Sequence, residues 1–104
     1  SPELREQFDV VVSRALAPLH VLAELTLPYC RVGGVMIALK KGDIAQEVAR
    51  ARVALDIMGG ELREIKSVNI HGLEDGRLLV ILGKIKSSPN KYPRRPGMAA
   101  KRPL

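Results

Sequence analysis

The chain has 104 residues, of which 46% are hydrophobic and 27% are charged, with a formal net charge of +6. The length suits one domain, and the composition is that of a soluble globular protein. No apolar run exceeds five residues, whereas a span through a bilayer needs roughly 20, so we expect no membrane contact. The single cysteine, Cys30, excludes an internal disulfide and a cluster of thiolate metal ligands. With no export signal in view, we expect a cytoplasmic protein.

The positive charge is concentrated in the last fifth of the chain. Residues 84–104 contain seven cations and no acid, whereas residues 1–83 contain ten cations and eleven acids. We therefore divide the chain into a nearly neutral body, residues 1–86, and a basic, proline-rich tail, residues 87–104, whose prolines forbid a long helix or a central strand. A basic tail suggests a polyanionic partner, most often a nucleic acid.

The first predicted element is a β-strand over residues 8–12. This short β-branched run is bounded by polar residues, which is typical of a strand buried on both faces in a parallel sheet. Ser13 and Arg14 follow at the carboxyl end of this strand.

A helix and a second strand are predicted next. Leucines at helical spacing predict a helix after Pro18, which suits a first turn, and Pro28 should end it. The glycines at 33 and 34 should close the connection. Residues 35–39 again have the composition of a buried strand.

The clearest predicted helix follows a turn of two lysines and Gly42. Asp43 can cap this helix, and Gln46 completes the spacing of a capping box. The glycines at 59 and 60 should end it in a left-handed cap. Its apolar stripe consists of Ile44, Val48, Ala51 and Leu55.

Two strands with no helix between them complete the body. Residues 62–70 alternate imperfectly and carry charges, which favours an exposed edge strand. Residues 78–85 are nearly all apolar and predict a buried strand antiparallel to the previous one. The order β-α-β-α-β-β predicts an α/β sheet, and its closing antiparallel pair matches the end of the methyltransferase variant of the doubly wound fold.

Three motifs of the chain resemble the RsmG family, also called GidB or glucose-inhibited division protein B. They are FDVVVSRA at residues 8–15, LKKG at residues 39–42, and SPNKYPRRPG at residues 88–97 followed by KRPL at residues 101–104. The similarity covers nearly the whole chain in the family's order. The family usually has a proline where Ala99 stands and one lysine where this chain has Lys40 and Lys41, so either lysine is a possible equivalent.

This resemblance implies a fold and an activity. Members of the family are bacterial enzymes that methylate N7 of a guanine in 16S ribosomal RNA, with S-adenosylmethionine as methyl donor. We expect an α/β fold corresponding to the C-terminal half of a Rossmann-like class I methyltransferase, mostly parallel with a final antiparallel strand pair. The family's glycine-rich loop and ribose-binding acid would precede Ser1. The chain alone should therefore supply only one wall of the donor pocket and be inactive.

Fold position and resemblance indicate the same donor-binding residues. Doubly wound folds bind ligands at the carboxyl ends of strands, where Ser13 and Arg14 lie, and the family's matching arginine contacts the donor. The alternative for Arg14 is a loop cap that bonds backbone carbonyls. Guanine N7 carries a free lone pair, so the transfer needs no base. We assign no catalytic residue and no metal site, because the sequence shows no catalytic triad, paired carboxylates or His/Cys cluster.

Basic residues provide the expected RNA contacts. Lys40 or Lys41 could face RNA or be a solvated turn cation, and tail cations could follow phosphates, with Arg94 and Arg95 favoured. Tyr92 could stack on a base, although packing against the sheet is the more common use of such a residue. The expected RNA-binding residues are Lys40, Lys41, Lys91, Tyr92, Arg94, Arg95, Lys101 and Arg102.

Two functions fit these features. The favoured one is part of an S-adenosylmethionine-dependent methyltransferase acting on ribosomal RNA, inactive as this chain alone. The alternative is a non-catalytic RNA- or ribosome-binding module that keeps the basic tail. In either case the strand from Phe8 to Val12 should present an open apolar edge, where the chain could associate with itself. Removal of residues 87–104 should weaken RNA binding and flatten its salt dependence.

Overall fold

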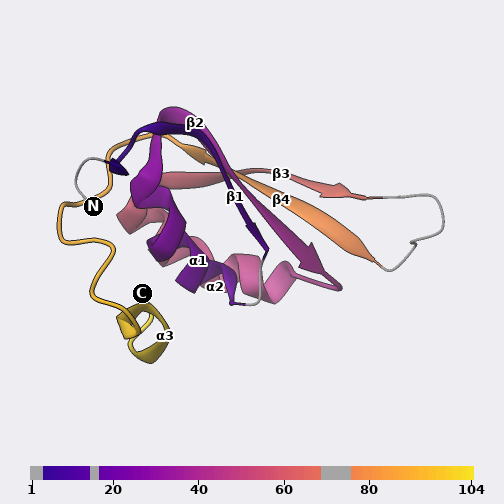
Figure 1. Cartoon of the computed structure of the whole chain (residues 1–104). Coiled ribbons are helices and arrows are strands. Elements are labelled where there is room, and N and C mark those ends of the chain that lie inside the picture. The colour runs from indigo at the N-terminus through magenta and orange to yellow at the C-terminus, as the bar shows by residue number, and fades with distance from the viewer. Residues whose placement is uncertain (1–3, 15–16, 69–75) are drawn as a thin grey trace.

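The computed structural model describes residues 4–14, 17–68 and 76–104 (Figure 1). One four-stranded sheet carries both main helices on the same face. The strands are β1 (Phe8–Arg14), β2 (Cys30–Lys41), β3 (Gly60–Ser67) and β4 (Arg77–Lys84), and the helices are α1 (Leu19–Thr26), the short 3-10 turn η2 (Leu27–Tyr29), α2 (Ala45–Met58) and α3 (Met98–Lys101).

The strand order in the sheet is β1-β2-β4-β3. β1 runs parallel to β2, while β4 runs antiparallel to both of its neighbours. The last strand is thus inserted between the second and the third in the opposite direction. This arrangement confirms the predicted α/β class and its closing antiparallel pair.

The prediction that the first strand is buried on both faces is wrong. β1 lies at an edge of the sheet, and Val10 and Val12 are 51% and 70% exposed. Both lie on the face opposite the helices, since Val11 between them pairs with the fully buried Met36. Within the described residues, no helix covers that face. A run of valines shows that a segment is apolar and favours a strand, but it does not show whether other elements cover both faces of that strand.

The pair Gly33 and Gly34 does not close a connection as predicted, but lies inside β2. The register shifts there, because Phe8 pairs with Cys30 while Val10 pairs with Val35. Gly33 has a φ of +91°, and a Cβ atom on Gly34 would lie 2.6 Å from the carbonyl oxygen of Asp9. Glycines inside a strand often mark such a bulge or a close backbone approach.

The predicted helices are present with small shifts at their starts. Pro18 is the N-cap of α1, one position before the first turn. In α2 the N-cap is Ile44, although Asp43 Oδ1 still accepts the N–H of Ala45 at 3.0 Å. The capping box predicted on Asp43 and Gln46 does not form, because Ile44 is the N-cap and has no side-chain cap hydrogen bond. The left-handed cap at Gly59 is confirmed by a φ of +82°.

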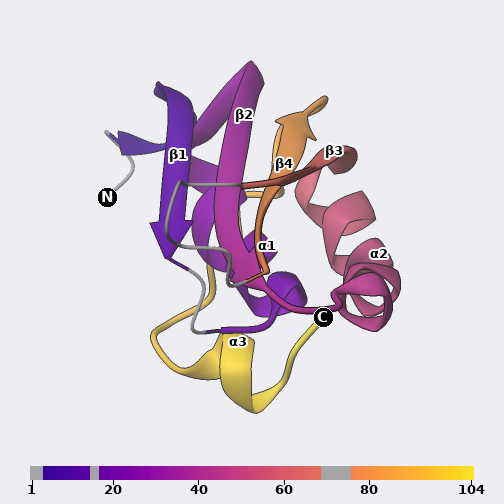
Figure 2. The same ribbon diagram turned by 90° about the vertical axis from the view of Figure 1, so that its right-hand side faces the viewer.

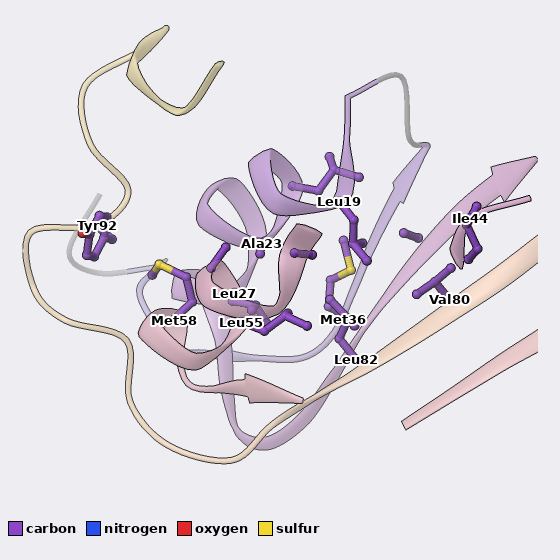
Figure 3. Packing of buried hydrophobic residues seen from close by; sticks show 14 residues of the cluster. Leu19, Ala23, Leu27, Met36, Ile44, Leu55, Met58, Val80, Leu82 and Tyr92 are labelled. Carbon is purple, nitrogen blue, oxygen red and sulfur yellow. The ribbon is translucent and has the colours of Figure 1, made fainter. Parts of the chain in front are cut away.

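The core lies between the sheet and the two helices (Figure 3). Aliphatic residues and methionines from both layers fill it, and Tyr92 from the tail joins the same cluster at 6% exposure. Each large side chain buried in this way contributes roughly 1.5–3 kcal/mol. The fully buried members include Leu19, Leu27, Met36, Met58, Val80 and Leu82.

The tail is fastened to the body by hydrogen bonds at its start. The guanidinium of Arg5 donates to the carbonyl oxygens of Ser88, Pro89 and Tyr92. The hydroxyl of Ser88 donates to the carbonyl oxygen of Met58 at 2.6 Å. The tail is thus part of the packed fold. None of the described helices is long and apolar enough to cross a membrane.

Candidate functional site

The carboxyl ends of β1 and β2 meet at one end of the sheet (Figure 2). Parallel pairing sets Arg14 directly beside Leu39, and Lys40 and Lys41 follow in β2. We call Ser13, Arg14, Lys40 and Lys41 the rim. Open α/β sheets bind their ligands outside this end of the strands, so the fold brings the predicted donor-binding and lysine positions together.

Arg14 is exposed, and its side chain makes no hydrogen bond or ion pair with any residue that the structure describes. The alternative role as a cap of the next loop concerns residues 15 and 16, which lie outside the described residues, so it stays a prediction. Ser13 beside it is half-buried. An exposed guanidinium of this kind is suited to a carboxylate or phosphate of a ligand.

The two rim lysines, which the sequence leaves equivalent, have different environments. Lys40 is 8% exposed, and its Nζ donates to the carbonyl oxygen of Ala17 at 3.0 Å and lies 2.6 Å from Glu47 Oε2. Lys41 is exposed. Only Lys41 of the pair has the accessibility that contact with a polyanion requires.

A histidine that carries no motif lies between α1 and α2. His20 is 5% exposed, and its Nε2 accepts a hydrogen bond from Arg50 Nε at 3.4 Å. Burial lowers the pKa of His20, Arg50 lowers it further, and Glu47 opposes both effects. The neutral imidazole is therefore favoured, which makes His20 a structural acceptor between α1 and α2.

Arg94, one of the two favoured phosphate contacts, has a structural partner. Its guanidinium donates to both carboxylate oxygens of Glu24, the shortest bond being 2.7 Å, and to the carbonyl oxygen of Arg102 at 2.6 Å. Glu24 is only 1% exposed. Arg95, by contrast, is exposed. The sequence could not separate these neighbours, because Glu24 lies 70 positions away.

Tyr92 is buried, as its interpretation as a packing residue predicts. The ring is 6% exposed and packs in the core, so its face is not open to a base. Lys91 Nζ lies 5.3 Å from the ring centroid, which is a cation–π contact.

Sequence reasoning missed two cations that hold the fold together, the buried Lys84 and the half-buried Arg5. Lys84 is fully buried, donates to the carbonyl oxygens of Leu27 and Cys30, and lies 3.3 Å from Glu6 Oε2. Arg5 binds the tail carbonyls described above. The only sign in the sequence that Lys84 is buried is its place at the end of an apolar strand. A buried ammonium needs carbonyl or carboxylate partners.

The remaining tail cations are open to solvent. They are Lys91, Arg95, Lys101 and Arg102. Across the described ranges, no three His, Cys, Asp or Glu side chains form a group that could hold a metal ion. At the rim and on the tail, the cations that remain accessible to a ligand are Arg14, Lys41 and these four tail residues.

Comparison with known proteins gives a consistent result. A family model described as rRNA small subunit methyltransferase G matches residues 2–77. The protein named ribosomal RNA small subunit methyltransferase G from Dehalococcoides mccartyi strain CBDB1 is 52% identical over 104 residues, which are 100% of this chain and 44% of that protein. The protein of that name from Clostridium tetani is 49% identical over 102 residues, or 98% of this chain and 43% of its own length. The chain thus spans less than half the length of these curated relatives.

A solved structure shares the fold. It is an rRNA methylase from Streptococcus thermophilus, with a TM-score of 0.51 and 18% identity, and the match covers 82% of this chain and 51% of that one. The similarity confirms the predicted architecture, part of a Rossmann-like sheet with a reversed last strand.

Proposed function

Because this chain belongs to the rRNA small subunit methyltransferase G family, we propose that it forms part of an S-adenosylmethionine-dependent methyltransferase acting on N7 of a guanine in 16S ribosomal RNA. The observation that carries this proposal is the rim, where Arg14 and Lys41 lie exposed at the ends of two adjacent parallel strands. A ribosomal RNA substrate implies a cytoplasmic location.

For this reaction, the residues of the chain need only hold the methyl donor and the guanine in position. When bound, the donor supplies an electrophilic methyl group on a sulfonium. Guanine N7 is an unprotonated nucleophile, so no side chain has to remove a proton. The residues of the rim would orient the two reactants and exclude water, which is catalysis by proximity.

The residues present fit the donor on one side. The exposed guanidinium of Arg14 suits the carboxylate of the donor's methionine moiety, and Ser13, the residue before it in β1, is the second donor-binding candidate. Lys41 is accessible to RNA phosphates at the same end of the sheet. One rim forms only one wall of a pocket, so we propose that the 104-residue chain alone is inactive.

Calorimetric titration with S-adenosylmethionine tests this function. The isolated chain should show no measurable binding. A hybrid in which the chain replaces the matching 44% of the Dehalococcoides mccartyi relative should bind the donor and methylate 16S ribosomal RNA. Micromolar binding by the isolated chain would contradict the one-wall proposal. A hybrid that binds RNA without binding the donor would favour the alternative, a non-catalytic RNA-binding module.

Arg14 should contribute measurably to donor binding. In the hybrid, Arg14→Gln is expected to weaken the affinity for S-adenosylmethionine by about tenfold or more, because a hydrogen bond to a charged group is lost. Titration calorimetry measures the change. Arg52→Gln, an exposed position on α2, is the matched control and should bind as the parent does. Equal affinities of the two variants would remove Arg14 from the donor site.

RNA binding should depend on the exposed tail cations. Deletion of residues 87–104 is a poor test, because it would also take Tyr92 out of the core. We expect the double variant Lys101→Gln and Arg102→Gln to bind 16S ribosomal RNA more weakly, with the slope of log K against log salt reduced by about 0.7 for each phosphate that is no longer neutralised. Fluorescence anisotropy across a salt series measures this slope.

A control with the same loss of charge completes this test. Arg63→Gln combined with Lys66→Gln changes two exposed positions on β3, at the sheet edge opposite β1. The control should keep the parent's slope. If both double variants lose the same slope, binding follows total charge and the tail has no special part in it.

We also propose that the chain associates with itself through β1. An apolar groove of about 420 Å³ runs along this edge, lined by Phe8, Val10, Val11, Val12 and Tyr29. Exposed apolar edge strands pair readily with other chains.

Sedimentation over a concentration series should show species larger than the monomer. Val12→Lys should restore the monomer, because a charge on an edge strand opposes pairing. Val53→Lys on α2, at a residue that is 58% exposed, should leave association unchanged. A parent chain that stays monomeric at high concentration would exclude this interface.

A further inference from the structure

Lys40 is a rim residue whose side chain points toward the helices. Side chains alternate along β2, so Met36, Ala38 and Lys40 share the buried face at 0%, 0% and 8% exposure. Lys41 follows on the open side. A buried ammonium is costly unless it finds partners, so the contacts of Lys40 indicate its role.

Those contacts join three elements. Lys40 Nζ donates to the carbonyl oxygen of Ala17 at 3.0 Å, in the connection between β1 and α1. It also lies 2.6 Å from Glu47 Oε2, in the first turn of α2. Glu47 Oε2 is buried and has no hydrogen-bond partner among the described residues, so its contact with Lys40 is an ion pair. We call these three groups the Lys40 bridge.

The Lys40 bridge fixes the far end of the segment that begins at Arg14. Arg14 pairs with Leu39 in the sheet, and Ala17, three residues later, is held by the next residue of the same strand. Both ends of this short connection are thus tied to consecutive positions of β2. The first turn of α1 begins directly after it, where Val21 and Leu22 donate to the carbonyl oxygen of Pro18 at 3.0 Å each.

We propose that Lys40 is a positioning residue, which holds Ala17 beside the carboxyl end of β2 and so keeps Arg14 directed toward the methyl donor without touching RNA. The inference rests on the proposed function, since it assumes that Arg14 meets the donor. It assigns different roles to two adjacent lysines: Lys40 positions Arg14, and Lys41 is the one of the two that faces the RNA.

Lys40→Met and Lys41→Met, made in the hybrid protein, test this division. Lys40→Met should lower the affinity for S-adenosylmethionine by about tenfold and leave the affinity for RNA and its salt slope unchanged. Lys41→Met should reduce the salt slope and leave donor affinity unchanged. In the 104-residue chain, Lys40→Met should also speed hydrogen exchange at the Val21 and Leu22 amides, whereas Lys41→Met should not.

The opposite pattern would overturn the inference. Donor affinity that is unchanged in Lys40→Met, or a reduction of salt slope equal to that of Lys41→Met, rejects the positioning role and leaves the proposed function standing. An unmutated hybrid that does not bind the donor rejects both. If Lys40→Met is too unstable to assay, Glu47→Gln removes the other end of the bridge, and it should shift donor affinity in the same direction with RNA binding unchanged.

Discussion

Replacement of Arg94 by methionine is expected to lower the free energy of unfolding measurably, and by more than replacement of its neighbour Arg95 does. The guanidinium is the charge partner of Glu24, whose side chain is 1% exposed, so its removal leaves a buried carboxylate uncompensated. The same change breaks the bond to the carbonyl oxygen of Arg102 and loosens the tail. Urea denaturation followed by circular dichroism measures the loss.

Arg95→Met is the matched control for this experiment. Arg95 is exposed, so its replacement should change stability by less than about 0.5 kcal/mol. Equal losses in the two variants would show that the Arg94–Glu24 pair does not anchor the tail.

The pH dependence offers a second measure of the same pair. Burial raises the pKa of Glu24, but hydrogen bonds from Arg94 outweigh it and hold the pKa below its ordinary value of 4.5. A carboxyl whose pKa is lower in the folded state stabilises the fold above its ordinary pKa, and this contribution is lost as the pH falls through the lowered value. The stability difference between the parent and Arg94→Met should therefore narrow below pH 4.5. A difference that stays constant down to strongly acidic pH would contradict this account.

Replacement of Lys84 by alanine should cost about 4 kcal/mol. The ammonium is fully buried, and two backbone carbonyls and Glu6 lose their partner when it goes. The alanine also leaves a cavity where the side chain lay. Thermal and urea unfolding measure the effect. Lys86→Ala, two residues later and exposed, should change stability by less than about 0.5 kcal/mol, and a similar loss there would point to net charge as the cause.

Periodicity and turn residues predicted most of the fold. Both helices, the reversed last strand and the position of Arg14 at a strand end follow from local patterns and from the rule that parallel strands end together. The alternation along β2 also carried a usable signal for Lys40, which is in phase with Met36 and Ala38.

Local sequence patterns could not predict which basic residues near the C-terminal end are buried or paired. Arg94 and Arg95 are chemically alike and adjacent, and what separates them is a carboxylate on α1 that only the folded chain brings near. The burial of Lys84 likewise depends on carbonyls of η2 and of the start of β2. A count of basic residues therefore overstates the charge that the tail can offer to RNA.

The hydrogen bonds of Arg5 also bear on how the molecule assembles. They join residues more than 80 positions apart, so the chain must close a long loop before they can form. Contacts of such long sequence separation slow folding. While a ribosome still holds residues 88–92, the turn that carries Arg5 has no acceptors for this guanidinium, so these bonds form only after that segment has emerged.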